Sequence, residues 1–364
     1  MSVKKNKIFF IAEAGVNHNG SMKNIIKMID IASKSGADAI KFQTFKASNL
    51  ATENAKKANY QLKTTNSKES HFNMLKKLEL SEKDHFKIKD YCKRKGIKFL
   101  STAFDFDSLN FLNKKINLDT FKIPSGEINN LPLLIEFGRT KKKIILSTGM
   151  STLKEIDKAI SYLAIGNILG RRRFDKNILK KELKKLTPKK KLKILKNKIS
   201  ILHCTTNYPA KNYELNLNAI KTISQNFNFT VGYSDHSMGI YASLAACALG
   251  ARIIEKHFTI SKKLEGPDHK ASLEPHELSS LIDNIRNIEF SLGDGVKKPF
   301  KSEIKNIRSI RKSLVARKNI KIGEIFSESN LTIKRPGTGK SPEKYWDYLE
   351  KKSKKNYNKD DIIS

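Results

Sequence analysis

The chain has 364 residues, of which 38% are hydrophobic, and a formal net charge of +35. It contains no run of about twenty apolar residues, so we expect no membrane-spanning helix, and residues 1–7 lack the apolar segment of a secretory signal. Its three cysteines, Cys92, Cys204 and Cys247, show no paired spacing. This pattern is typical of a reduced compartment, and we expect a cytoplasmic protein with free, buried thiols.

The positive charge raises the hypothesis of a nucleic-acid partner, because such proteins carry clustered cations. Of the 71 basic residues only 11 are arginine, although phosphate-binding surfaces commonly exploit the arginine fork. The charge concentrates between Arg171 and Lys198, where 14 basic residues stand against two acidic ones. We interpret this stretch as a solvated basic insertion and predict no nucleic-acid partner. A basic scaffold that binds polyanions through it is a remote alternative.

Eight short apolar runs alternate with apolar residues at helical spacing. In chain order the runs are 8–11, 38–40, 97–100, 120–121, 144–146, 199–202, 229–231 and 252–254. The last helix is predicted to begin at Pro275, since proline suits the first turn of a helix. Eight such units predict an α/β protein with a TIM (β/α)8 barrel. A doubly wound sheet, the competing fold, would gather its polar residues near one switch point instead of at every strand end.

Two segments fall outside the eightfold pattern. Residues 165–198 form a Lys-rich insertion, in which a helix over 177–186 is predicted to end before Pro188. Beyond the last barrel helix, short apolar runs and turns indicate a small β-rich domain. The predicted division is therefore a barrel domain over 1–297, a linker over 298–308 and a C-terminal domain over 309–364.

Polar side chains follow the apolar runs, at the positions where the strands of a barrel would end. His236 and His257 follow the last two runs, and two imidazoles on one rim are a plausible seat for a divalent metal with open positions. Lys41 and Lys122 suit a phosphate or carboxylate, because charge-assisted hydrogen bonds are strong. Four acids complete this set: Glu13, Glu127, Glu255 and Asp268. The combination predicts either carbon–carbon bond formation or phosphoryl release, and spacing does not choose between them.

The order of these motifs resembles the sialic acid (nonulosonic acid) synthase family. The matching segments are Ile11–Gly20, Lys41–Thr44, Ser101–Phe104, Lys122–Glu127, Ser147–Met150, His203–Pro209, Ser234–His236, Glu255–Thr259 and Gly266–Lys270. The tail, with Lys334–Gly337, is similar to the antifreeze-like (SAF) domain of that family, which has a β-clip fold. The resemblance covers nearly the whole chain except residues 165–198.

The resemblance implies that phosphoenolpyruvate condenses with N-acetylmannosamine and water to give N-acetylneuraminate and phosphate, with Mn²⁺ or Mg²⁺ as cofactor. It implies that His236 and His257 hold the metal, and a carboxylate, first Glu13 and then Glu127, activates water or relays protons. The implied phosphoenolpyruvate ligands are Lys41, Thr102, Lys122, Ser125, Ser147 and Ser234, with Thr206 where some relatives have Asn. The implied sugar ligands are Glu13, Gln43, Tyr208, Glu255 and Asp268.

The resemblance also implies a homodimer in which the antifreeze-like domain is exchanged between subunits, with Arg335 reaching the sugar site of the partner. The acceptor sugar stays open at this point. N-acetylmannosamine is placed first. The alternatives are 2,4-diacetamido-2,4,6-trideoxymannose, which would make the product legionaminic acid, and the pseudaminic acid precursor.

Overall fold

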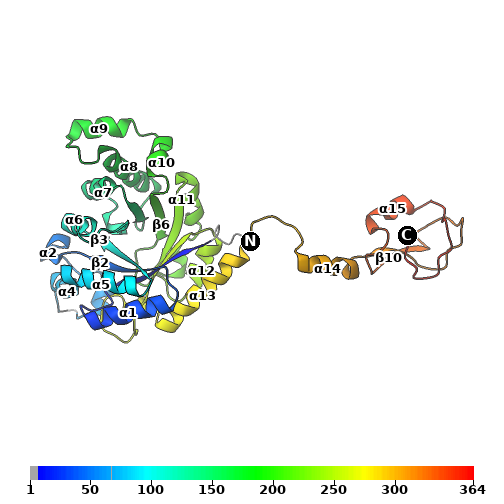
Figure 1. Ribbon diagram of the computed structural model, residues 1–364, viewed down its shortest axis with the longest axis horizontal. Helices are drawn as coiled ribbons and strands as arrows, with labels where there is room; N and C mark the ends of the chain where they lie inside the picture. The colour runs from blue at the N-terminus through cyan, green and yellow to red at the C-terminus, as the bar shows by residue number, and fades with distance from the viewer. Residues whose placement is uncertain (1–6, 67) are drawn as a thin grey trace. The chain divides into compact units, whose positions relative to one another are not determined.

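The computed structural model describes residues 7–66 and 68–364. The chain divides into two compact units, Met1–Gly293 and Asp294–Ser364, and each is described here by itself. In the first unit, eight parallel strands close a barrel in sequential order (Figure 1). They are β1 (Phe9–Gly15), β2 (Ala39–Thr44), β3 (Lys98–Ala103), β4 (Thr120–Ile123), β5 (Lys143–Ser147), β6 (Ile199–Cys204), β7 (Thr230–Asp235) and β8 (Ile253–His257). The predicted TIM barrel is confirmed.

Helices surround this barrel, and several begin with the capping residues that the sequence provides. Ser21, Ser81, Asp105 and Thr152 each accept a hydrogen bond from a first-turn N–H group, which satisfies a donor that the helix itself cannot pair. The helices of the first unit are α1 (Met22–Lys34), α2 (Ala47–Leu50), α3 (Asn59–Thr64), α4 (His71–Leu78), α5 (Glu82–Arg94), α6 (Phe106–Lys114), α7 (Leu131–Arg139), α8 (Leu153–Leu169), α9 (Lys176–Lys184), α10 (Pro188–Leu195), α11 (Ala219–Phe227), α12 (Tyr241–Ala248) and α13 (Pro275–Ser291). The last of them begins at Pro275, as predicted.

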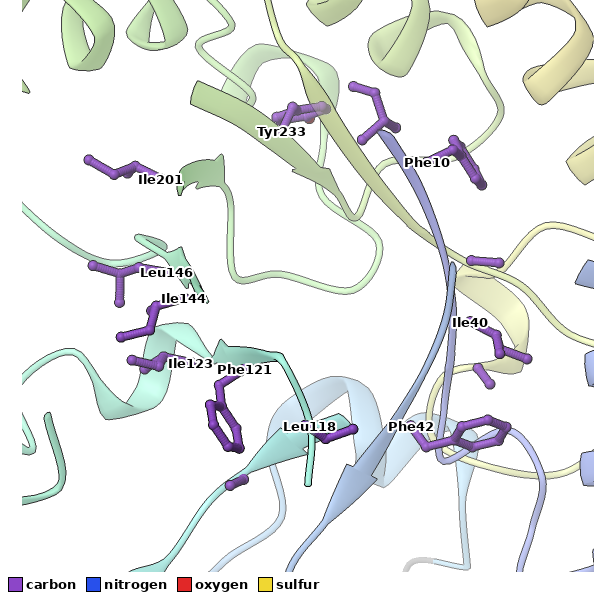
Figure 2. Close-up of a cluster of buried hydrophobic side chains, with 14 of the residues drawn as sticks. Phe10, Ile40, Phe42, Leu118, Phe121, Ile123, Ile144, Leu146, Ile201 and Tyr233 are labelled. Atoms are coloured by element: carbon purple, nitrogen blue, oxygen red, sulfur yellow. The ribbon is translucent and has the colours of Figure 1, made fainter. Parts of the chain in front are cut away.

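The main core lies between the strands and the surrounding helices. Figure 2 shows outward-facing strand residues of this layer, among them Phe10, Ile40, Phe121 and Tyr233, all fully buried. Burial of side chains of this size contributes about 1.5–3 kcal/mol each. The inward-facing residues form a second, smaller cluster that fills the bottom of the barrel: Ile11, Ala39, Leu100, Ile145, Leu202 and Ile253. The interior of the barrel is therefore packed with apolar side chains below the level at which the polar residues of the strands begin.

The first residues of the predicted insertion, 165–169, belong to α8, one of the helices that surround the barrel, and Leu169 is buried there. The helix predicted over 177–186 is α9, which ends at Lys184, and Pro188 begins a further helix, α10, where its fixed φ angle suits the first turn. Both α9 and α10 lie beside α8 (Figure 1), and Leu195 at the end of α10 joins the main core.

The second unit is small and built of short β segments, which confirms the predicted β-rich domain. Helix α14 (Lys301–Ile310) occupies most of the predicted linker, β9 (Ser313–Ala316) pairs antiparallel with β10 (Leu331–Lys334), and α15 (Tyr345–Tyr348) follows. Its core consists of Leu314, Ala316, Ile320, Phe326, Leu331, Tyr357 and Ile363. Across both units, no helix in the described ranges is long and apolar enough to cross a membrane.

Candidate active site

The polar residues of the site form the next inward-facing layer above the apolar bottom of the barrel. Successive side chains of a strand alternate in direction, so the residue two positions after an inward-facing apolar residue also points inward. Glu13 follows Ile11 in this way, and Glu255 follows Ile253. The same relation holds for Lys41, Thr102, Ser147 and Cys204 on their own strands, whereas Ser234 follows Gly232 and Lys122 follows Thr120. The carboxyl ends of the strands thus bring distant residues of the chain into one layer.

Two lysines and two glutamates form a buried network in this layer. Lys41 Nζ lies 2.7 Å from Glu13 Oε2 and 3.7 Å from Glu255 Oε2, and donates a hydrogen bond to Thr102 Oγ1 at 3.0 Å. Lys122 Nζ lies 3.1 Å from Glu255 Oε1, which also accepts a hydrogen bond from Ser234 at 2.8 Å. The charged side chains are almost fully buried, so each depends on the others for compensation.

The two glutamates ionise differently. Burial raises the pKa of Glu13 to about 7, because Lys41 compensates it only in part. Burial alone would also raise the pKa of Glu255, but Lys122 and Lys41 outweigh it and hold that pKa well below its usual range. Glu255 is therefore a fixed negative charge between two lysines, whereas Glu13 can gain or lose a proton near neutral pH.

His236 and His257 face one another across the ends of β7 and β8, with ring centroids 5.6 Å apart. His236 Nδ1 lies 2.7 Å from the carbonyl oxygen of Thr205, which leaves Nε2 facing the site. His257 Nδ1 is buried, has no hydrogen-bond partner among the described residues, and lies 4.0 Å from Asp268 Oδ2. Burial lowers the pKa of both rings, that of His236 to about 4.

Neutral imidazoles are the form that binds metals, and the nitrogens that face the site make at most one long contact, from His236 Nε2 to Ser234 Oγ at 3.4 Å, so the pair fits a metal ion with two protein ligands. Within the described ranges no group of three or more His, Cys, Asp or Glu side chains is arranged to hold one. The other positions would belong to substrate or water. Gly15 makes room for this arrangement: its φ of +53° favours glycine, and a Cβ atom there would lie 3.4 Å from His257 Cε1.

A second group of polar side chains gathers at the ends of β4, β5 and β6. Ser125 Oγ accepts a hydrogen bond from the N–H group of Gly149 at 2.9 Å and lies 3.2 Å from Cys204 Sγ. Ser147 Oγ is buried and has no partner among the described residues. A Cβ atom on Gly149 would lie 2.1 Å from Thr206 Oγ1, so glycine is required for this close approach. Together with Lys122 these groups form a cationic, hydroxyl-rich end of the site.

An aromatic wall closes the other side of the histidine pair. The ring centroid of Tyr208 lies 4.2 Å from that of His236 and 5.1 Å from that of Tyr60, which belongs to α3. Helix α3 also donates a hydrogen bond from Thr64 to the carbonyl oxygen of Pro267. Beside this wall, burial raises the pKa of Asp268 to about 6.

Nearly all of the predicted site residues line a single cavity of about 280 Å³ at the carboxyl ends of the strands. They are Glu13, Lys41, Gln43, Thr102, Lys122, Ser125, Ser147, Thr206, Tyr208, Ser234, His236, Glu255, His257 and Asp268. Glu127 is not among the lining residues, and its carboxylate accepts a hydrogen bond from Asn130 at the start of α7. Arg335 lies in the second unit, where its Nε donates to the carbonyl oxygen of Ile310.

Sequence reasoning missed two features of the site. Cys204 could have been found, because it stands two positions after the inward-facing Leu202. Tyr60 carried no comparable signal, since it belongs to a short helix between β2 and β3 and its contact with Tyr208 depends on the tertiary fold.

A (β/α)8 barrel with buried lysines, carboxylates and facing imidazoles at the carboxyl ends of its strands defines the class of TIM-barrel enzymes. The model of the NeuB family matches residues 28–297, and that of the SAF domain matches residues 311–364. The chain belongs to the NeuB family, which confirms the resemblance seen in its motifs.

Individual relatives cover almost the whole chain. It is 51% identical to the N,N'-diacetyllegionaminic acid synthase of Campylobacter jejuni over 98% of this chain and 99% of that protein. The protein of the same name from Legionella pneumophila is 40% identical over 92% of this chain and 87% of its own. Among solved structures, the N-acetylneuraminic acid synthetase of Leptospira borgpetersenii is 34% identical, with a TM-score of 0.66 over 83% of this chain and 90% of that chain. Since its relatives are sugar-acid synthases, the chain is an enzyme with small-molecule substrates.

Proposed function

We propose that the chain is an N,N'-diacetyllegionaminic acid synthase, which condenses phosphoenolpyruvate with 2,4-diacetamido-2,4,6-trideoxymannose and water. The products are a nine-carbon 2-keto acid and phosphate. The observation that carries the proposal is one cavity that holds both a cationic, hydroxyl-rich end and a facing imidazole pair. The relatives at 51% and 40% identity support this acceptor better than N-acetylmannosamine, which the motifs alone placed first.

The cationic end suits phosphoenolpyruvate, which carries a phosphate and a carboxylate. Lys41 and Lys122 supply buried ammonium groups, and Ser125, Ser147 and Thr206 supply hydroxyl groups that line the same cavity. Anions at such a site gain from charge-assisted hydrogen bonds in a medium of low dielectric constant. Glu255 holds both ammonium groups in place, because its carboxylate lies 3.7 Å from Lys41 Nζ and 3.1 Å from Lys122 Nζ.

The histidine pair suits the sugar aldehyde. His236 and His257 would hold Mn²⁺ or Mg²⁺, which when bound supplies a Lewis acid for the aldehyde oxygen. Tyr208 packs against both imidazoles and limits the space beside them. Asp268 and Gln43 line the same cavity and offer hydrogen-bond partners to the sugar hydroxyl and amide groups.

In the proposed reaction, a bond forms between C3 of phosphoenolpyruvate and the aldehyde carbon, and water adds to C2. The resulting tetrahedral intermediate loses phosphate when its C2–O bond breaks, which leaves the 2-keto group. The added water must lose a proton, and the alkoxide formed from the aldehyde must gain one. Glu13 is suited to move these protons, because its pKa of about 7 lies near the working pH.

The experiment that tests the proposal is phosphate release from phosphoenolpyruvate in the presence of Mn²⁺ with each sugar. The proposal predicts turnover with 2,4-diacetamido-2,4,6-trideoxymannose that exceeds turnover with N-acetylmannosamine. A preference for N-acetylmannosamine would make the chain an N-acetylneuraminate synthase instead. Turnover with the pseudaminic acid precursor alone would reject both assignments and leave the reaction class standing.

A further inference from the structure

One side of the cavity is lined by apolar residues that the proposed reaction does not use. We call this side the apolar lobe and define it by Val16, Leu50, Met74, Leu75, Leu78 and Phe104. These residues follow β1, β2 and β3, in the connections at the carboxyl ends of those strands. The lysines, the buried glutamates and His257 instead lie at the ends of the strands themselves, with Lys41 on β2 and Lys122 on β4. The lining of the cavity is thus divided by depth, with charged and polar groups at the strand ends and the apolar lobe in the connections beyond β1, β2 and β3.

The residues of the apolar lobe are held in place by packing against one another and against neighbouring side chains. Met74, Leu75 and Leu78 lie on one side of α4, whose first turn is capped by Ser70. Together with Val16 they form a buried cluster that is separate from the main core. The ring of Phe104 packs edge-on against Phe45 of that cluster, with centroids 6.0 Å apart. Packing of this kind fixes the shape that a ligand meets.

The place of the apolar lobe fixes which part of the acceptor it meets. The reacting aldehyde must lie near the ends of β7 and β8, where the imidazoles are, and phosphoenolpyruvate must lie near the lysines and hydroxyl groups. The closure of the barrel places β1 next to β8, followed by β2 and β3. Because phosphoenolpyruvate and the aldehyde occupy the layer at the strand ends, the far end of the sugar extends into the connections above it, and those that follow β1, β2 and β3 come next around the barrel after β8.

The apolar lobe favours some substituents over others at the end of the acceptor sugar that lies away from the aldehyde. A hydroxymethyl group there would lose its hydrogen bonds to water without replacement, because none of the six residues that define the lobe has a polar side chain. A methyl group would instead gain from leaving water. An acetamido group would bury its methyl and keep its amide at the polar edge, where Gln43 and Gln61 line the same cavity.

We propose that the apolar lobe binds the apolar substituents at the far end of the acceptor, and thereby selects a deoxy, N-acylated sugar over one that carries hydroxyl groups there. This inference rests on the proposed function and deepens it, since it assigns acceptor choice to the connections after β1, β2 and β3. Met74 is the residue that tests it best, because it lines the cavity, is only 4% exposed and has a polar isostere in glutamine.

The experiment compares wild-type enzyme with Met74→Gln, Met74→Leu and Met238→Gln. For each, kcat/KM is measured with 2,4-diacetamido-2,4,6-trideoxymannose and with N-acetylmannosamine, and the KM for phosphoenolpyruvate serves as an internal control. We expect Met74→Gln to lower kcat/KM for the trideoxy sugar by about 10- to 100-fold while N-acetylmannosamine changes by less than about threefold. Met74→Leu should keep the wild-type preference. Met238 is exposed on the connection after β7 and does not line the cavity, so its variant should behave as wild type.

A folded Met74→Gln enzyme that loses activity equally with both sugars, or keeps its preference, would overturn the role of the apolar lobe while the proposed function stands. Wild-type enzyme that prefers N-acetylmannosamine, or uses neither sugar, would overturn the proposed function and the inference with it. If thermal unfolding shows that Met74→Gln does not fold, Leu50→Gln at the partly exposed end of α2 provides the same comparison.

Discussion

Two glutamates that contact the same lysine differ in ionisation, and this difference assigns their roles. Glu255 lies between two ammonium groups and stays charged, whereas Glu13 has one close cation and a buried carboxylate. A group that accepts a proton must be deprotonated at the start of the step. Activity that depends on Glu13 should therefore rise with pH through about 7.

The first prediction concerns this rise. Glu13→Gln should lower kcat by at least about 100-fold, the scale of a lost general base, and its residual activity should no longer rise near pH 7. The measurement is the pH profile of kcat for wild type and variant. Glu127→Gln is the matched comparison, because Glu127 does not line the cavity, and it should keep the wild-type rise. A rise near pH 7 that persists in Glu13→Gln but disappears in Glu127→Gln would exchange the two assignments.

The second prediction concerns the imidazole pair. His236→Ala and His257→Ala should each lower turnover by about 100-fold or more. Each substitution removes one of the two proposed protein ligands of the metal, and the other residues of the cavity do not take its place. The affinity of both variants for Mn²⁺, measured by electron paramagnetic resonance titration, should fall in parallel. His276→Ala, at an exposed position of α13, should bind Mn²⁺ and turn over as wild type. Near-normal Mn²⁺ affinity in both active-site variants would remove the pair from the metal site.

At the scale of elements, the sequence predicts the strands well because most strands combine two signals. An apolar run identifies the strand, and a polar residue two positions beyond an inward-facing apolar one identifies the site, as for Ile11 and Glu13 or Ile253 and Glu255. The segment between β2 and β3 lacks such a signal. Its helices α3 and α4 are short, and the contribution of α3 to the cavity depends on contacts with Tyr208 and Pro267, which are distant in sequence. The helix predicted over 177–186 is found as α9, whereas α10, which begins at Pro188, was missed because the proline indicated only the end of a helix.

The third prediction concerns the seam where the barrel closes. Asp38 precedes β2, and its carboxylate accepts a hydrogen bond from the N–H group of Phe10 at 2.9 Å and pairs with Arg286 of α13 at 2.7 Å and with Lys7 at 2.8 Å. Asp38→Asn should lower the free energy of unfolding by about 1–3 kcal/mol, the scale for hydrogen bonds to charged groups. Urea denaturation at neutral pH measures this loss.

The same variant has a definite pH dependence. Burial alone would raise the pKa of Asp38, but its bonds to Lys7, Phe10 and Arg286 outweigh burial and lower that pKa. The stabilisation is therefore present above the unfolded pKa of about 3.9 and is lost as the pH falls through the lower folded value. The difference between wild type and Asp38→Asn should shrink at acidic pH. A difference that grows on acidification would contradict this account. Asp90→Asn, at an exposed position of α5, is the control.

At the scale of the whole molecule, the large positive charge does not need a nucleic-acid partner to account for it. The basic stretch after Arg171 is folded onto α8 through α9 and α10, and the buried Lys191 pairs with Asp157 of α8. Most of its other cations are exposed and solvated. A deletion of this whole stretch would remove Leu195 from the core, so it would test folding as well as charge.

The fourth prediction belongs to the assembly. We propose the homodimer that the family resemblance implies, in which Arg335 serves the sugar site of the partner subunit. Arg335→Ala should raise the KM for the acceptor sugar by about tenfold or more, the scale of a lost charged hydrogen bond, while the KM for phosphoenolpyruvate is unchanged. Sedimentation should show a dimer for both proteins. Arg317→Ala, exposed in the same unit, is the control, and an unchanged sugar KM in Arg335→Ala would reject the role of Arg335.

The central claim is that the cavity joins phosphoenolpyruvate to an acceptor sugar and releases phosphate by cleavage of the C–O bond. The most direct test uses phosphoenolpyruvate labelled with ¹⁸O at the bridging oxygen, with Mn²⁺ and 2,4-diacetamido-2,4,6-trideoxymannose. The account predicts that the label leaves in phosphate, and that mass spectrometry detects an unlabelled nine-carbon keto acid in equal amount. Phosphate without the label, or labelled phosphate with the sugar unchanged, would contradict it.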